Sequence, residues 1–239
     1  MSAWIFKWGD TRMAPATLLR FSGLTLVIGA AMALIGNTAT SLLFPDNSNP
    51  TYAINPLYVP LNLLATIGTI LVLLGLPALY AHRARELGVI GLAGTVLIAL
   101  TGMMFGVFFG LFSVLFAPYL ATQAPQLMTG DGPPALFPFF ILGTLAQVCG
   151  SVLFALPMLR GRMLPRWPGY ALVISALFAV LSFFLSGQGS PTTPLTILAN
   201  LLPPLLLVLV LGWLGYLMWR TSSTASEQPM PRTASQAVA

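Results

Sequence analysis

Charged residues are scarce in this chain of 239 residues, which has only ten Lys or Arg and five Asp or Glu, or 6% of the total. An average soluble domain has about 25%. A soluble fold of this size could not cover its surface with so few charges. Hydrophobic residues, by contrast, make up 57% of the chain. The composition therefore excludes soluble, disordered and fibrous proteins, and it predicts an all-α, polytopic membrane helix bundle.

Histidine and cysteine occur once each, as His82 and Cys149. One residue of each kind cannot form a His/Cys metal site or supply two axial histidines to a haem. No ionisable residue is expected in mid-membrane, so a proton relay or charge-coupled carrier lacks its usual groups. The motifs Gly-x-Ser-x-Gly and His-Glu-x-x-His and the phosphate loop are absent as well. We therefore expect no metal, no cofactor and no catalytic residue, and we interpret the protein as not an enzyme.

Long apolar runs fill most of the chain. A helix that crosses the hydrocarbon core needs about 20 apolar residues. Uncharged runs, divided by turns rich in Pro, Gly and Asn, predict six transmembrane helices in a domain that spans residues 21–219. Their ranges are 21–44, 57–80, 87–120, 136–159, 170–185 and 195–219. The third is too long for one perpendicular crossing, so it should tilt, kink or protrude.

The basic residues predict the orientation. With six spans, all ten fall on one side of the membrane, whereas the loops on the other side hold only Asp46 and Asp131. The ten are Lys7, Arg12, Arg20, Arg83, Arg85, Arg160, Arg162, Arg166, Arg220 and Arg232. Basic loops face the cytoplasm, so both termini should be cytoplasmic, with residues 1–20 as an interfacial segment and 220–239 as a disordered tail. The same topology explains the net charge of +5 without a nucleic-acid partner.

A short motif recurs along the chain. Arg-x-x-Gly opens the odd-numbered helices at residues 20–23, 85–88 and 166–169, and Leu-Pro-x-Leu closes two even-numbered ones around Pro77 and Pro157. One interpretation is a hairpin that is repeated three times about an axis along the membrane normal. The alternative is that Arg, Gly and Leu are common at cytoplasmic helix ends.

Gly102, Gly106 and Gly110 lie four residues apart on one face of the third predicted helix. This spacing lets two backbones approach closely, which promotes helix association in lipid. We interpret the stripe as a helix-packing site within the chain. The alternative is a face for a homo-oligomer or for a partner membrane protein.

Four amide side chains fall inside the predicted helices, at Asn37, Asn62, Gln147 and Asn200. An unpaired amide in hydrocarbon costs several kcal/mol, so these side chains should face the bundle interior. There they would either form hydrogen bonds between helices, which contribute on average about 0.6 kcal/mol each, or line an outward-opening polar pocket that binds a ligand. Both interpretations fit the spacing.

Two consecutive prolines, Pro203 and Pro204, interrupt the last predicted helix. They remove two backbone donors and should kink the helix. The kink alone accounts for the pair. Alternatively, the carbonyls freed near Asn200 bind a cation or a ligand hydroxyl.

The run Leu-Gly-Leu-Pro-Ala-Leu-Tyr at residues 74–80, a basic loop, and Leu-Gly-Val-Ile-Gly-Leu at 87–92 resemble a family of bacterial six-helix, multi-pass membrane proteins of uncharacterised activity. Leu-Pro-Arg-Trp at 164–167 is similar too. The resemblance implies a bacterial cytoplasmic membrane, with the lipid bilayer as partner, and it implies no activity. Two functions stay open. The first is a non-catalytic module that binds an apolar or lipid-like ligand, or a partner protein, within the bundle. The second is a small transporter or channel with an outward-facing pocket formed by the four amides.

Overall fold

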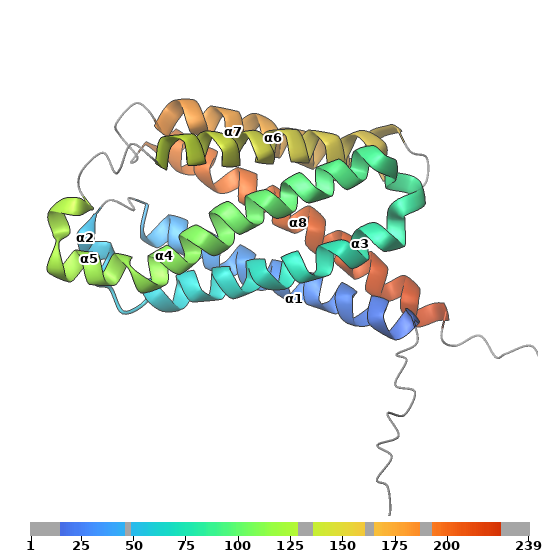
Figure 1. The fold of residues 1–239 in the computed structure, drawn as a ribbon, viewed down its shortest axis with the longest axis horizontal. Helices are drawn as coiled ribbons and strands as arrows, with labels where there is room; N and C mark the ends of the chain where they lie inside the picture. The colour runs from blue at the N-terminus through green and yellow to red at the C-terminus, as the bar shows by residue number, and fades with distance from the viewer. Residues whose placement is uncertain (1–14, 46–48, 129–135, 161–164, 187–192, 226–239) are drawn as a thin grey trace, which may run out of the picture.

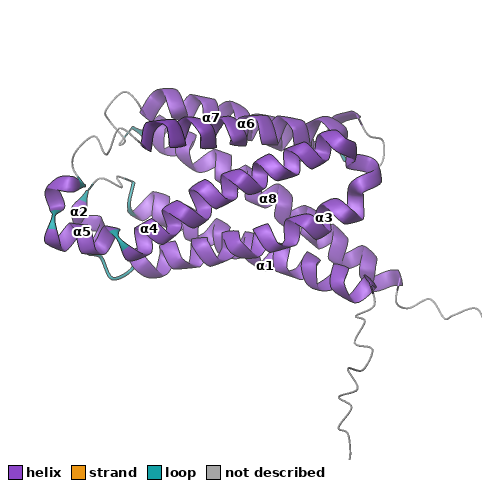
Figure 2. Ribbon diagram, viewed as in Figure 1, coloured by secondary structure: helices purple, strands orange, loops and turns teal. Residues whose placement is uncertain are grey.

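A computed structural model describes most of the chain. The described residues are 15–45, 49–128, 136–160, 165–186 and 193–225. They form helices joined by short connections, with no strand among them (Figure 2). The interfacial segment up to residue 14, the tail from residue 226 onward, Asp46 and Asp131 lie outside the described residues.

Five long helices make up the body of the structure (Figure 1). They are α1 (Pro15–Leu43), α3 (Tyr58–Thr101), α6 (Leu136–Arg160), α7 (Trp167–Ser186) and α8 (Pro194–Ala225). The short elements are α2 (Pro50–Ala53), the π-helix η1 (Gly102–Phe108), α4 (Phe109–Leu115), α5 (Ala117–Gln123) and the 3-10 helix η2 (Pro125–Leu127). Helix α1 begins before the predicted boundary at residue 21, and α8 continues past the predicted end at residue 219. The long third prediction, 87–120, is interrupted by η1 and by a break at Phe116.

Helix α3 turns back on itself at Gly88. Its φ of 58° and ψ of −164° lie in a region that only glycine adopts readily. The Tyr80 hydroxyl donates a hydrogen bond to the Gly88 carbonyl over 3.3 Å. Arg83 and Glu86 form an ion pair of 2.9 Å at the same turn. The turn divides α3 into a first arm, residues 58–87, and a second arm that starts at residue 89 and continues through η1 and α4.

The glycine stripe joins the two arms of this hairpin. A methyl group on Gly106 would lie 2.4 Å from Thr69, and one on Gly110 would lie 2.1 Å from the Thr66 hydroxyl. On Gly102 it would lie 3.0 Å from the end of Leu73. The three glycines therefore face the first arm of the same chain, in an antiparallel register.

Within the described part of the chain, five helical segments are long and apolar enough to cross a membrane. They are Thr17–Leu43, Tyr58–Gln123, Leu136–Arg160, Trp167–Leu185 and Pro194–Thr221. The second covers 66 residues and includes both arms of α3. Many large apolar side chains are exposed on the outside of the bundle, Val89 by 82% and Leu74 by 67%, as lipid contact requires. By the length, apolar composition and exposed side chains of its helices, the structure confirms the prediction of an all-helical, multi-pass membrane protein.

The helices pack as a closed ring in chain order. Helix α1 lies against the first arm and against α8, the second arm lies against α6, and α7 lies between α6 and α8. Glycines make the tightest of these contacts: a methyl group on Gly29 would lie 2.7 Å from the Gly68 carbonyl, and one on Gly23 would lie 2.9 Å from the Gly215 carbonyl. The Arg-x-x-Gly glycines differ in their surroundings: an added methyl group would contact α8 at Gly23 and α6 at Gly169, whereas at Gly88 it would meet open space within 4 Å.

One end of the ring carries all the charged side chains of the described residues. They are Arg20, Arg83, Arg85, Glu86, Arg160, Arg166 and Arg220. Figure 1 shows that the start of α1, the α3 turn, the end of α6 and the end of α8 meet at this end, which we call the arginine end. Short helices α2 and α5 pack together at the opposite end, the far end, on an apolar cluster that includes Phe44, Tyr58 and Ala121.

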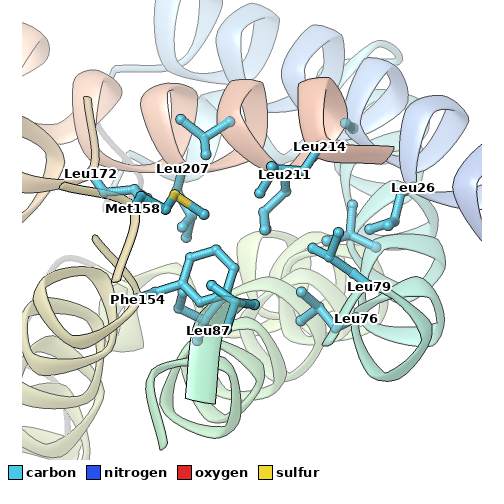
Figure 3. Close-up of a cluster of buried hydrophobic side chains, with 14 of the residues drawn as sticks. Leu26, Leu76, Leu79, Leu87, Phe154, Met158, Leu172, Leu207, Leu211 and Leu214 are labelled. Carbon is cyan, nitrogen blue, oxygen red and sulfur yellow. The ribbon is translucent and has the colours of Figure 1, made fainter. Parts of the chain in front are cut away.

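An apolar cluster fills the ring in the half near the arginine end (Figure 3). Leu26 of α1, Phe154 of α6 and Leu172 of α7 are completely buried in it. Figure 3 shows that side chains from α1, α3, α6, α7 and α8 point toward one another here. Buried hydroxyls at the level of this apolar plug include Thr95, which donates to the Gly91 carbonyl over 2.8 Å, and Ser151, whose hydroxyl has no partner among the described residues.

Candidate functional site

The other half of the ring encloses a cavity of about 1210 Å³. Its wall comes from α1, both arms of α3, η1, α4, α6, α7 and α8. Leu76, Ile98 and Leu211 form its floor and also belong to the apolar plug. Pockets for small organic ligands commonly measure about 300–1,000 Å³. The cavity is therefore large enough for a ligand of lipid size.

All four amides that we singled out in the sequence line this cavity. Asn37 comes from α1, Asn62 from the first arm, Gln147 from α6 and Asn200 from α8. The helices bring them together because each amide avoids lipid by facing the interior of the ring. Gly102, Gly106 and Gly110 line the same cavity, at the joint between the two arms.

The first arm presents mainly hydrogen-bond acceptors to the cavity. The Thr66 hydroxyl donates to the Asn62 carbonyl over 2.7 Å, and the Thr69 hydroxyl donates to the Ala65 carbonyl over 2.9 Å. Thr101, in the second arm, donates to the Leu97 carbonyl over 3.0 Å. A hydroxyl has one proton and two lone pairs, so each of these side chains has used its donor within its own helix and retains acceptor capacity.

Helix α8 adds a second polar wall. The Ser182 hydroxyl donates to the side-chain carbonyl of Asn200, and the Ser175 hydroxyl donates to the Pro203 carbonyl over 2.8 Å. Pro203 and Pro204 have no N–H, so the carbonyls four residues earlier, of Ala199 and Asn200, lose their helical donors. Both prolines line the cavity, which places the irregular part of α8 at its wall.

Thr40 contributes an orphaned polar atom to the same cavity. Its hydroxyl oxygen is buried and has no hydrogen-bond partner among the described residues, and the residue lines the cavity next to Asn37 and Ser41. Buried polar atoms nearly always have partners. A donor group on a bound ligand would supply one.

The wall between the second arm and α6 is aromatic. Phe105, Phe109 and Phe140 line the cavity with ring centroids 5.0–6.1 Å apart. Phe137, Phe183 and Phe184 line it as well. The cavity is therefore amphiphilic, because both amides and hydroxyls and aromatic rings line it.

Among the described residues, no Asp, Glu, Lys, Arg or His side chain lines the cavity. Nor do the described residues contain a group of three or more His, Cys, Asp or Glu side chains that could hold a metal ion. The arrangement can hold a neutral molecule by hydrogen bonds and apolar contact. It offers no acid, base or nucleophile with a partner to activate it.

Sequence reasoning missed part of this site. Ser182 carried no signal, because a single serine late in an apolar helix is compatible with any orientation. Phe140 belongs to a second helix, and its stacking on Phe105 depends on tertiary structure.

Comparisons of the chain with protein-family models, with curated proteins and with solved structures found no match.

Proposed function

We propose that this protein is a non-catalytic membrane protein that binds an uncharged, amphiphilic ligand in the cavity. The observation that carries the proposal is the mixed lining of the cavity, which combines amides and hydroxyls with aromatic rings and includes no Asp, Glu, Lys, Arg or His among the described residues. A ligand with a small polar group and an apolar body matches this lining. A charged ligand would be desolvated there without a countercharge, which is unfavourable in a low-dielectric interior.

We also propose that the chain crosses the membrane six times, with each arm of α3 as a separate span and with the arginine end in the cytoplasm of a bacterial cell. The first arm, 58–87, is about 45 Å long at about 1.5 Å per residue, enough for the roughly 30 Å of the hydrocarbon core. The arginine residues at the described end of the bundle support a cytoplasmic position. Both termini would then be cytoplasmic.

Thiol labelling of vesicles tests this topology. In a Cys149→Ser background, a membrane-impermeant maleimide should modify Tyr119→Cys, at the exposed far end, only from the outside of the cell membrane. It should modify Ala81→Cys, near the α3 turn, only in inverted vesicles. Labelling of both variants from the same side would mean that the second arm does not cross.

Removing two amides should weaken ligand binding. We expect Asn37→Leu combined with Asn200→Leu to lower the affinity for a diacylglycerol with a fluorescent acyl chain about 30-fold in nanodiscs, because two hydrogen bonds of about 1 kcal/mol each are lost. Ile35→Leu combined with Leu198→Ile is the matched control, since these residues are exposed on the lipid side of the same helices. Unchanged affinity in a folded double amide variant would refute a role for the polar wall.

A transporter is the second candidate. The apolar plug closes the cavity toward the arginine end, while the cavity lining extends to Phe44 and Pro45 near the far end. One-sided access of this kind is typical of one state of an alternating-access carrier. Uptake of glycerol into proteoliposomes by the native protein, and its loss in the double amide variant, would favour transport over simple binding.

A further inference from the structure

The second arm and α6 separate as they run from the arginine end to the far end. Near the arginine end their backbones touch: a methyl group on Gly94 would lie 2.6 Å from the Phe154 nitrogen, and one on Gly150 would lie 3.0 Å from the Ile98 nitrogen. Farther along, Gly143 of α6 faces the tip of the Phe105 ring instead, at 2.5 Å. A whole aromatic ring therefore separates the two backbones at this level. Figure 1 shows the second arm running diagonally away from α6 toward α4.

Five phenylalanines fill the space between the separated segments. We call this cluster the aromatic portal; its members are Phe105, Phe108, Phe109, Phe139 and Phe140. Ring centroids lie 5.2 Å apart between Phe108 and Phe139 and 5.0 Å apart between Phe109 and Phe140. Thus side chains alone close this part of the ring.

The aromatic portal has one side in the cavity and one side on the outer surface. Phe109 and Phe140 line the cavity. Phe108 is 50% exposed and does not contribute to the cavity lining. Since rings held only by packing can change rotamer, and since η1 is an irregular π-helical turn of the kind found at functional sites, this wall is a place where the cavity can open sideways into the bilayer.

The polar side of the cavity limits the headgroup of a ligand that enters this way. Thr66, Thr69 and Thr101 have used their protons within their own helices and keep acceptor capacity. The hydroxyl oxygen of Thr40 has no partner among the described residues. The amides of Asn37, Gln147 and Asn200 line the same cavity and carry both donors and acceptors. The threonine part of the wall is therefore rich in acceptors and can accept hydrogen bonds from a ligand hydroxyl.

We propose that the cavity binds a neutral lipid with a hydroxyl headgroup, such as a diacylglycerol, and that this lipid enters from the bilayer between α6 and the segment formed by η1 and α4, through the aromatic portal. The proposal rests on the function proposed above and names its ligand class. The hydroxyl donates to the acceptor-rich wall, and the acyl chains lie along the phenylalanines.

Crosslinking the portal tests the route. In a Cys149→Ser background, Phe108→Cys and Phe139→Cys are joined by a short bifunctional maleimide in nanodiscs, and diacylglycerol with a fluorescent acyl chain is then added in donor vesicles. Crosslinking should slow binding of the probe at least about tenfold relative to the same protein before crosslinking. These two side chains lie outside the cavity lining, so the binding site itself is unchanged.

The matched control joins α7 to α8 at the arginine end. Trp167 and Trp213 have ring centroids 4.9 Å apart, close to the spacing of the portal pair, and neither lines the cavity. Crosslinked Trp167→Cys plus Trp213→Cys should bind the probe at the uncrosslinked rate. Equal rates in the portal crosslink and in this control would overturn the lateral route, while failure of every protein to bind the probe, the native one included, would overturn the proposed function as well.

The headgroup is tested by competition in the native protein. Unlabelled diacylglycerol should displace the fluorescent probe at a concentration about tenfold lower than its methyl ether, which cannot donate a hydrogen bond. Phosphatidylglycerol, which carries a charge, should compete no better than the ether. If the ether competes as well as the free hydroxyl, or if phosphatidylglycerol competes better, the assignment of a neutral hydroxyl lipid is wrong.

Discussion

Replacing Gly68 with alanine should destabilise the bundle by about 3 kcal/mol, at the upper end of the usual cost of overpacking. The added methyl group would lie 2.4 Å from the Ala33 nitrogen and 2.7 Å from the Gly29 carbonyl oxygen. Both neighbours are backbone atoms of α1, so no side chain can rotate away and α1 itself must move. The expected result is a lower midpoint of unfolding by SDS in mixed micelles, followed by circular dichroism.

Gly102→Ala is the matched control for this experiment. It places the same methyl group 3.0 Å from the end of the Leu73 side chain, which can adjust its rotamer. We expect a cost below about 1 kcal/mol. If both variants unfold at the same midpoint, the close approach of α1 and the first arm does not depend on Gly68.

Three glycines at the contact of α1 and the first arm differ from those of the stripe in what they face, since their nearest neighbours include backbone atoms, whereas Gly102, Gly106 and Gly110 face side chains. Lipid offers helices little hydrophobic reason to associate, so close packing of backbones carries much of the interaction. Gly29, Gly36 and Gly68 allow that approach between α1 and the first arm. Gly29 and Gly36 lie seven residues apart in α1, but their pairing with the first arm depends on which helices become neighbours.

The helical runs of the bundle could be predicted because the bilayer imposes a length and a composition on each span. The prediction 136–159 differs from helix α6, Leu136–Arg160, by one residue. The ends of the helices were harder to predict, because the bilayer does not constrain residues beyond its hydrocarbon core. Helix α8 continues to Ala225 because nothing in the sequence after Arg220 breaks a helix at once.

The turn within α3 shows a second limit of prediction from the sequence. The basic residues around Arg83 predicted a loop, and the chain does reverse there, but it stays helical up to a single non-helical residue, Gly88. The same glycine had been interpreted as part of a repeated motif. Its positive φ and the open space around the position of a Cβ show that Gly88 serves the turn rather than the close packing of two helices seen at Gly23 and Gly169.

The polar half of the site was predictable for an energetic reason, and the aromatic half was not. An amide in lipid is costly enough that Asn37, Asn62, Gln147 and Asn200 were expected to face inward, and all four line the cavity. Phenylalanine is tolerated equally in lipid, in the core and at a cavity wall. Sequence alone therefore could not separate Phe105 from the exposed Phe116.

Filling the polar side of the cavity should abolish ligand binding. We expect Asn37→Trp combined with Asn200→Trp to weaken binding of the fluorescent diacylglycerol more than 100-fold, or by more than about 2.7 kcal/mol, measured by titration in nanodiscs. Two indoles would occupy the space that the headgroup needs beside Thr40 and the prolines of α8. The headgroup would be displaced toward the apolar part of the lining, which includes Phe105, Phe109 and Leu207, and an unpaired hydroxyl there costs about 1–3 kcal/mol.

The control for this variant is Ile35→Trp combined with Leu198→Trp, which adds the same indoles to the lipid-exposed sides of α1 and α8. It should bind the probe as the native protein does, because neither residue lines the cavity. If the cavity variant keeps its affinity while both variants unfold at the native midpoint, the lipid does not bind between α1 and α8. If both variants lose binding equally, the loss comes from altered packing of the two helices, since α1 and α8 contact each other directly through Gly23 and Gly215. Only loss in the cavity variant alone assigns the headgroup to the polar wall.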